Sequence, residues 1–179
     1  CPEKGLHLLV EAVRLLEADP AYHGKIRLRA AGWLGARDRA YFEALAGDVE
    51  YLGEVDREGK SRFLHSLDVL SVPTVYREPK GLFALEAMAH GVPVVQPRHG
   101  AFPEMLAATG GGLLVEPGSA EDLARGLARL IDDPGLRAEL GRAGRDAVHH
   151  RFTAAVEAEN VLAVYRQVLD GRQRERVSA

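Results

Sequence analysis

Apolar positions in the first part of the chain repeat first at helical spacing and then at strand spacing. Leu6, Leu9 and Leu16 lie on one stripe of period 3.6, which predicts an opening helix. Residues 26–31 then alternate and end at Gly32, as a strand that leads into a loop does. The same reading along the chain predicts strands at 26–31, 49–52, 68–72, 93–96 and 112–115, and further helices near 38–46, 56–66, 82–90, 102–108, 119–131, 135–151 and 153–169.

Short apolar strands alternate with helices through most of the chain. This order is typical of an α/β fold in which a parallel sheet lies between helix layers. Ligands of such folds bind at the carboxyl ends of the strands. A βαβ unit should open with a strand, so we expect one before residue 1. We expect residues 1–170 to form one domain and the polar residues 171–179 to form a frayed tail.

Length, net charge and cysteine content limit the partners and the cellular setting that fit this chain. With 179 residues the chain is long enough for one domain with a sizeable core. A formal charge of −3 gives no pull toward nucleic acid, and membrane contact is left open. The single cysteine is residue 1, which excludes an internal disulfide and fits a cytoplasmic setting. No run reaches the ~18 apolar residues that a membrane span needs.

The candidate chemistry centres on residues 78–86, which hold two carboxylates eight positions apart. Gly81 permits a turn that passes close to a ligand, and good helix formers follow it. Glu78 is therefore predicted on a loop and Glu86 about one turn inside a helix. The free N–H groups of that helix start suit a phosphate. A hydroxyl-rich ligand that carries phosphate, such as a nucleotide sugar, fits this pattern.

Other motifs give weaker signals. Residues 53–61 look like a phosphate loop, but five residues separate the glycines and the interior is acidic, so we interpret them as a loop and a polar helix start. The histidines lack metal-ligand spacing, no D-x-D is present, and we expect no metal site. His99 lies in a loop predicted to face the ligand. Lys4, at the head of the first helix, is either a surface lysine or a partner for a diphosphate.

Together these segments resemble a known family. Residues 78–95, EPKGLFALEAMAHGVPVV, look like the E-x7-E signature of retaining GT-B glycosyltransferases of the "group 1" type. Residues 2–5 (PEKG), 99–104 (HGAFPE) and 112–118 (GLLVEPG) are similar to further segments of that family in the same order. The resemblance covers nearly all of residues 2–169.

The resemblance implies roles for three charged residues. Glu86 would bind the ribose hydroxyls of the nucleotide, and Glu78 would face the transferred sugar. Lys4 would supply positive charge to the leaving diphosphate. An arginine that the family has a few residues before this lysine falls ahead of residue 1. Lys80 departs from the family pattern, which commonly has an aromatic residue there.

The remaining implications concern the ligand and the architecture. The donor would be a UDP-, GDP- or ADP-sugar, with no cofactor or metal. This chain would be the C-terminal, Rossmann-like donor-binding domain, and an N-terminal acceptor-binding domain would be missing. The further donor-binding residues implied are Gly81, Leu82 and Phe83 for sugar and diphosphate, Gly53 and Val55 near the base, and His99 and Gly100.

Three functions therefore remain. The leading expectation is the donor-binding domain of a retaining glycosyltransferase, inactive without its acceptor domain. The second is a nucleotide-sugar-binding module without catalysis. The third is a glycoside hydrolase that uses Glu78 and Glu86 as a carboxylate pair, against which the parallel α/β pattern and the phosphate-ready helix start both argue.

Overall fold

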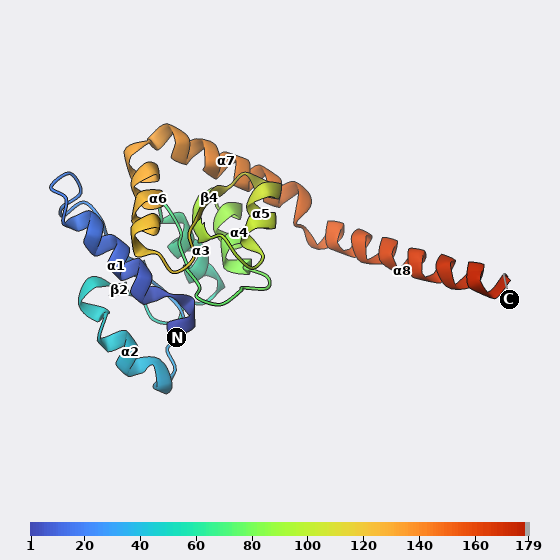
Figure 1. The fold of residues 1–179 in the computed structure, drawn as a ribbon, viewed down its shortest axis with the longest axis horizontal. Helices are drawn as coiled ribbons and strands as arrows, with labels where there is room; N and C mark the ends of the chain where they lie inside the picture. Colours follow the sequence, from blue (N-terminus) through green and yellow to red (C-terminus); the bar gives the residue numbers. More distant parts are fainter. Residues whose placement is uncertain (178–179) are drawn as a thin grey trace.

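The computed structural model of the chain is an α/β domain from which one long helix projects (Figure 1). It describes residues 1–177, with the surroundings of side chains given through residue 170. The strands are β1 (Arg29–Ala30), β2 (Glu50–Tyr51), β3 (Val94–Pro97) and β4 (Gly112–Val115). The α-helices are α1 (Leu6–Glu17), α2 (Arg39–Glu43), α3 (Arg57–His65), α4 (Leu82–Ala89), α5 (Phe102–Thr109), α6 (Ala120–Asp132), α7 (Pro134–Arg151) and α8 (Ala154–Val177). Short 3₁₀ turns lie at Pro2–Lys4, Ala36–Asp38 and Ala46–Asp48.

All strand pairing in the described residues is parallel, which confirms the predicted fold class. Strand β1 pairs with β2, and β3 pairs with β4 from Val94↔Gly112 to Pro97↔Val115. The prediction of one continuous sheet is wrong in detail, because these pairs form two separate sheets. The predicted strand 68–72 contributes a single parallel bridge, Leu70 to Val94. That segment therefore has a partner on one side only.

Burial of the strands is uneven. Strand β3 is buried throughout, as a strand covered on both faces should be. Strand β1 is half-buried and β2 is exposed, so neither is covered on both faces as β3 is. The glutamate and tyrosine that form β2 suit such an edge position.

Two apolar clusters make the core. One is built around Met88 of α4 and Phe102 of α5, both fully buried. The other joins α1 to α6 through Leu16, Leu123 and Leu130. Ser119 caps α6, because its hydroxyl accepts a hydrogen bond from the N–H of Asp122 at 3.1 Å. The clusters fix α1 and α4, whose N-terminal ends carry the candidate site.

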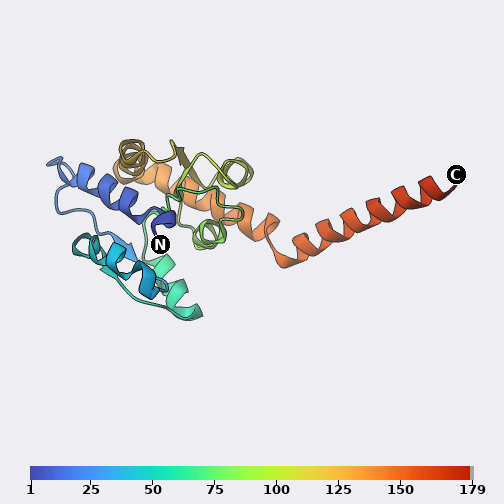
Figure 2. The same cartoon turned by 60° about the horizontal axis from the view of Figure 1, so that its bottom comes forward.

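Helix α8 points away from the body of the domain in both views (Figures 1 and 2). It continues to Val177, past the predicted end near Leu169. Residues 178–179 of the predicted tail lie outside the described residues, and the division into a domain and a tail stays a prediction. Among residues 1–177, no helix has the length and apolarity needed to cross a bilayer.

Candidate functional site

Lys4, Tyr76 and Glu78 form a hydrogen-bonded cluster between the heads of α1 and α4. The Lys4 Nζ donates to Glu78 Oε2 at 2.8 Å and to the Tyr76 hydroxyl at 2.6 Å. The Tyr76 hydroxyl in turn donates to Glu78 Oε2. Lys4 also lies over the ring of Phe83, 5.2 Å from its centroid. The structure thus brings together three residues that the sequence predicted, Lys4, Glu78 and Phe83, and adds Tyr76.

The cluster holds Glu78 in its charged form. Only 10% of the Glu78 side chain is exposed, against 42% for Lys4. Burial by itself raises the pKa of Glu78, but hydrogen bonds from Lys4, Tyr76 and the N–H groups of Gly81 and Lys80 lower that pKa to about 2. Burial lowers the pKa of Lys4, yet its bonds to Glu78 and Tyr76 leave that pKa raised overall. Glu78 is therefore a carboxylate, and Lys4 a cation, at neutral pH.

Gly5 places Lys4 in this position. Its φ of 74° is in the left-handed region, and a Cβ there would lie 1.9 Å from the carbonyl oxygen of Pro73. The backbone around Gly5 therefore lies directly against the loop that carries Glu78. The N–H of Val75 donates to the carbonyl of Glu3 at 2.9 Å and closes the same contact.

Gly81 sets the start of α4. It adopts φ 61°, and a Cβ would come 2.9 Å from the Phe102 ring. Its N–H donates to Glu78 Oε1 at 3.3 Å. The N–H groups of Leu82 and Phe83 come next, and they have no acceptor in the described part of the chain. Since the Leu82 side chain is 58% exposed, this helix start is open to solvent.

Glu86 lies one turn further along α4 and is half-buried. Its Oε1 accepts a hydrogen bond from Lys60 Nζ of α3 at 2.6 Å, and both side chains remain more than 40% exposed. His90 contacts the carbonyl of Glu86 through Nδ1 at 2.7 Å and Ser61 through Nε2 at 3.0 Å. Lys60 could not be found from the sequence alone, because periodicity places it on a polar helix face without telling which acid that face meets.

The loop before α5 supports the Glu78 backbone. A Cβ on Gly100 would lie 2.5 Å from the Glu78 carbonyl oxygen, which also accepts a hydrogen bond from the N–H of Ala101. His99 Nε2 contacts the carbonyl of Thr74 at 2.9 Å, while its Nδ1 is buried without a partner in the described chain. His99 and Gly100 thus lie against residues 74–78, and their contact with a ligand stays a prediction.

Gly53 and Val55 belong to a separate loop. The carbonyl of Gly53 accepts from the N–H of Gly32 at 2.8 Å, which joins the ends of β1 and β2. Asp56 caps α3 by accepting from the N–H of Gly59 at 2.6 Å, so a carboxylate occupies this helix start. The interpretation of residues 53–61 as a loop and helix start is confirmed. In the described residues no hydrogen bond or ion pair joins residues 53–56 to Glu78 or Glu86, and the link to Glu86 comes from Lys60, further along α3.

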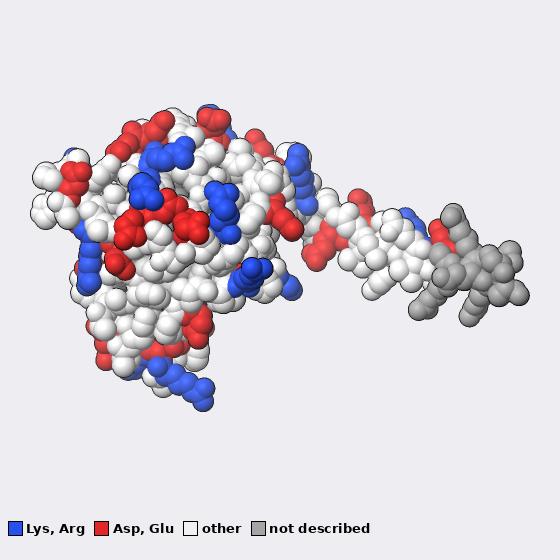
Figure 3. Space-filling model, in the orientation of Figure 1, with Lys and Arg blue, Asp and Glu red and all other residues white. Residues whose placement is uncertain are grey.

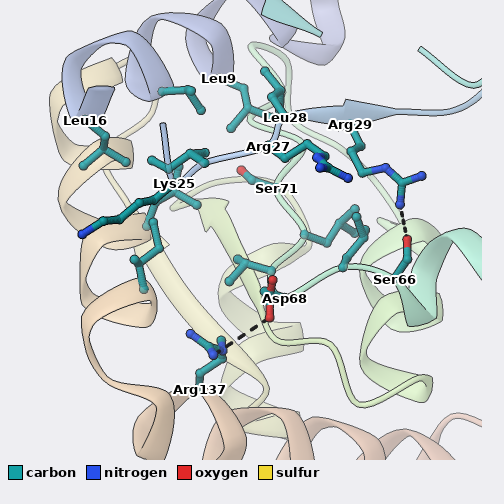
Figure 4. Close-up of a pocket in the computed structure, with 17 residues that line it drawn as sticks. Leu9, Leu16, Lys25, Arg27, Leu28, Arg29, Ser66, Asp68, Ser71 and Arg137 are labelled. Atoms are coloured by element: carbon teal, nitrogen blue, oxygen red, sulfur yellow. Dashed lines mark hydrogen bonds and ion pairs between the residues drawn. The ribbon is translucent and has the colours of Figure 1, made fainter. Parts of the chain in front are cut away.

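On the face seen in Figure 3, acidic and basic side chains are interspersed. One cavity lies between β1 and the 68–72 segment (Figure 4), and another lies beside α8. Neither is lined by Glu78 or Glu86. That Glu78 and Glu86 contact one and the same ligand stays a prediction. No group of three metal-ligating side chains is found among the residues that the structure describes.

Comparison with known proteins gives a family match. Residues 1–147 match the family model "Glycosyl transferases group 1". Over 177 residues the chain is 31% identical to phosphatidyl-myo-inositol mannosyltransferase of Mycobacterium leprae, covering 93% of this chain and 44% of that protein. The chain spans less than half the length of the first curated relatives that it matches.

Solved structures share the fold. The C-terminal domain of a group 1 family glycosyltransferase (LpcC) from Francisella tularensis superposes with a TM-score of 0.75 at 26% identity, covering 86% of this chain and 82% of that domain. The Anabaena protein HepE, solved with UDP and glucose, gives a TM-score of 0.81 at 21% identity, covering 93% of this chain and 46% of that one. The second likeness concerns the fold alone.

Proposed function

The chain belongs to the group 1 glycosyltransferases, and we propose that it is the domain that binds the nucleotide-sugar donor in a retaining member of that family. Its fold matches a C-terminal domain of this family that was solved by itself. The chain spans less than half the length of its curated relatives. The reaction that the whole protein catalyses is therefore also a proposal.

One observation carries this proposal. Lys4, the open start of α4 and the anionic Glu78 lie together, linked by the 2.8 Å contact between Lys4 and Glu78. An ammonium group and two free N–H groups suit a diphosphate, whose negative charge they stabilise. A carboxylate beside them suits the hydroxyl groups of a sugar. A ligand that joins a diphosphate to a sugar satisfies both.

Each site residue then has a task. Lys4 and the N–H groups of Leu82 and Phe83 stabilise the charge that grows on the leaving nucleoside diphosphate. Glu78 faces the transferred sugar, and Glu86 accepts hydrogen bonds from the ribose. Gly53 and Val55 flank the base, and the loop of His99 and Gly100 holds the Glu78 backbone in place. The donor is a UDP-, GDP- or ADP-sugar. The solved complex of HepE with UDP and glucose supports this ligand class.

The acceptor lies on a second domain outside this chain. The isolated chain is therefore expected to bind the donor weakly and to transfer nothing. The second domain holds the acceptor, and its closure over the donor excludes water.

A glycoside hydrolase fits the site less well. A carboxylate pair of that kind needs one member protonated near neutral pH. Glu78 has a pKa of about 2, and the Glu86 carboxylate is hydrogen-bonded to Lys60. Glu78 is therefore unsuited to donate a proton to a leaving group.

Titration calorimetry with UDP, GDP and ADP, and with glucose and mannose as free sugars, tests the proposal. We expect at least one nucleoside diphosphate to bind and the free sugars to bind more weakly. Transfer assays on the full-length protein with the matching nucleotide sugar separate an enzyme from a binding module, because a module binds without turnover. Absence of binding to all three diphosphates by both the chain and the full-length protein would remove the proposal.

A further inference from the structure

Trp33 is the only tryptophan of the chain, and 76% of its surface is open to solvent. No other large apolar side chain among the described residues is as exposed. An indole offers a large flat apolar surface, so covering it by a ligand is favourable. Single exposed apolar residues are nevertheless common on protein surfaces. The position of Trp33 and the contacts that support it therefore decide what this residue can do.

Trp33 lies at the end of the sheet where ligands of parallel α/β folds bind. It follows Ala30, the last residue of β1, by three positions. The N–H of the neighbouring Gly32 donates to the carbonyl of Gly53 at 2.8 Å, which joins the Trp33 loop directly to the loop of Gly53 and Val55. Gly53 and Val55 are the residues proposed above to flank the base. Trp33 is therefore attached to the base side of the proposed donor site.

The indole of Trp33 is held in place by its neighbours. The carbonyl of Gly32 accepts a hydrogen bond from the Tyr51 hydroxyl at 2.6 Å, and the Tyr51 ring packs against Phe42 of α2 with the ring centroids 4.7 Å apart. Gly35 is buried, and a Cβ there would come 2.6 Å from Cη2 of Trp33. The benzo edge of the indole thus rests against Gly35, while most of the ring stays open to solvent.

A path of contacts connects the Trp33 loop to Glu86, the residue proposed for the ribose. The loop of Gly53 leads into Asp56, the N-cap of α3. Lys60 lies about one turn further along α3 and donates to Glu86 Oε1 at 2.6 Å. The base of a nucleotide is bonded directly to its ribose. A ribose held by Glu86, with its diphosphate at the start of α4, would therefore have its base on the side of α3 and the Trp33 loop.

The groups beside Trp33 suit an uncharged part of a ligand. Glu54 is exposed, and the Asp56 carboxylate already caps α3. Two carboxylates repel phosphate groups, whereas a nucleobase is neutral and its N–H groups can donate to a carboxylate. The backbone N–H groups of Glu54 and Val55 have no acceptor in the described part of the chain. This loop therefore offers both donors and an acceptor to the edge of a base.

We propose that Trp33 is the surface on which the base of the donor nucleotide stacks. Bases stack on aromatic side chains through their flat faces, while hydrogen bonds read their edges. Trp33 would supply the face contact, and residues 54–55 would meet the edge of the same base. Because a nucleotide must occupy the site, this role of Trp33 rests on the proposed function. Trp33 then contributes to donor binding and takes no part in the transfer of the sugar.

Tryptophan fluorescence of this chain tests the proposal, because its emission comes from Trp33 alone. The chain is titrated with UDP, GDP and ADP, and free tryptophan is titrated in parallel to correct for absorption and collisional quenching by the nucleotides. We expect every diphosphate that binds in titration calorimetry to quench the emission with the same saturation curve. Pyrophosphate, which has no base, should leave the emission unchanged.

Variants at position 33 separate stacking from plain apolar contact. Trp33→Ala and Trp33→Leu should weaken binding of the preferred diphosphate at least about fivefold, the lower end of what base–aromatic stacking contributes. Trp33→Phe keeps a ring and should retain most of the affinity. Since Trp33 is exposed, all three variants should keep the native unfolding midpoint. Calorimetry on this chain and on the full-length protein ensures that weak binding by the chain alone does not hide the effect.

Gly35→Ala tests the support of the ring. Its φ of −70° accommodates alanine without strain, but the added Cβ would displace the indole. We expect diphosphate binding to weaken, though less than in Trp33→Ala.

The outcomes distinguish this role of Trp33 from the proposed function. Equal diphosphate binding by Trp33→Ala and the native chain, with unchanged emission, would overturn the role of Trp33 and leave the donor site in place. Absence of diphosphate binding by both the chain and the full-length protein would overturn the proposed function and the role of Trp33 together. Equal losses in Trp33→Leu and Trp33→Phe would exclude stacking. An emission shift that follows protein concentration instead of nucleotide would mean that a second copy covers the ring, which would also overturn the proposal.

Discussion

Lys4 and Glu78 stand 74 positions apart in the chain, and their charged atoms are 2.8 Å apart in the structure. The contact joins the head of α1 to the loop that leads into α4. It leaves Glu78 charged and lays the Lys4 ammonium group over the ring of Phe83. A cation and an open helix start are thereby held together before any ligand arrives, which is the condition for electrostatic preorganisation.

The first prediction concerns the stability of the domain at low pH. Glu78 has an ordinary pKa of 4.5 when unfolded and about 2 when folded. A lowered pKa contributes stability that is complete above the unfolded value and is lost as the pH falls through the folded value. The difference in unfolding free energy between the native chain and Glu78→Gln should therefore be constant above pH 5 and shrink between about pH 4.5 and 2. Urea titrations across this range measure it. A difference that does not change with pH would contradict the Lys4–Glu78 contact.

The second prediction concerns Tyr76, whose hydroxyl donates to Glu78. Tyr76→Phe removes that donor and should raise the pKa of Glu78 toward its ordinary value, while the bond from Lys4 keeps it below that value. Tyr22→Phe is the matched control, because Tyr22 donates to Asp132 instead. Carbon NMR titration of the glutamate carboxyls gives the pKa directly. A Glu78 pKa that is the same in both variants would exclude Tyr76 from the cluster.

Much of this arrangement follows from local sequence. Gly81 followed by helix formers predicts the start of α4, and apolar runs such as 93–96 predict buried parallel strands, because each pattern depends on neighbours in the chain. The Lys60–Glu86 contact and the position of Tyr76 depend on how α3 and the Glu78 loop pack against distant segments. The division of the sheet into two pairs of strands does not follow from local sequence either. Whether the second edge of segment 68–72 pairs with another strand depends on residues outside that segment.

The third prediction concerns Gly5. Gly5→Ala combines a left-handed backbone with a Cβ 1.9 Å from the Pro73 carbonyl oxygen. Gly24→Ala is the control, because Gly24 has φ 70° and no atom within 4 Å of its Cβ position. The control should cost about 1 kcal/mol of unfolding free energy from backbone strain alone. Gly5→Ala should cost more than about 3 kcal/mol, in the range of a buried clash. Equal costs in urea unfolding would mean that the contact between Gly5 and Pro73 is absent.

The fourth prediction concerns Lys60. Its ion pair with Glu86 is exposed on both sides, so Lys60→Ala should change the unfolding free energy by less than about 1 kcal/mol. Binding of the preferred nucleoside diphosphate should weaken about threefold to tenfold, because Lys60 orients Glu86 and adds positive charge near an anionic ligand. Arg62→Ala, in the exposed pair with Glu58, is the control for general loss of charge. Equal binding by both variants would separate Lys60 from the site.

The last prediction assigns different binding partners to Glu86 and Glu78. Glu86→Gln replaces a charged acceptor of ribose hydroxyls with a neutral one, and should weaken binding of a bare nucleoside diphosphate by about 1–2 kcal/mol. Glu78→Gln should change that binding little, because the partner proposed for Glu78 is the sugar. With the complete nucleotide sugar, both substitutions should weaken binding.

Titration calorimetry of the native chain and the two variants, each with the diphosphate and with the matching nucleotide sugar, separates these roles. The stability of each variant is measured in parallel, since Glu78→Gln also removes the partner of Lys4. An unpaired Lys4 would attract the diphosphate more strongly, so any change from Glu78→Gln should favour binding. A carboxylate that contacts only the transferred sugar cannot affect binding of the bare diphosphate, which lacks that sugar. Equal losses of diphosphate affinity in both variants, or no loss in Glu86→Gln, would therefore mean that Glu86 does not bind the ribose while Glu78 binds the sugar.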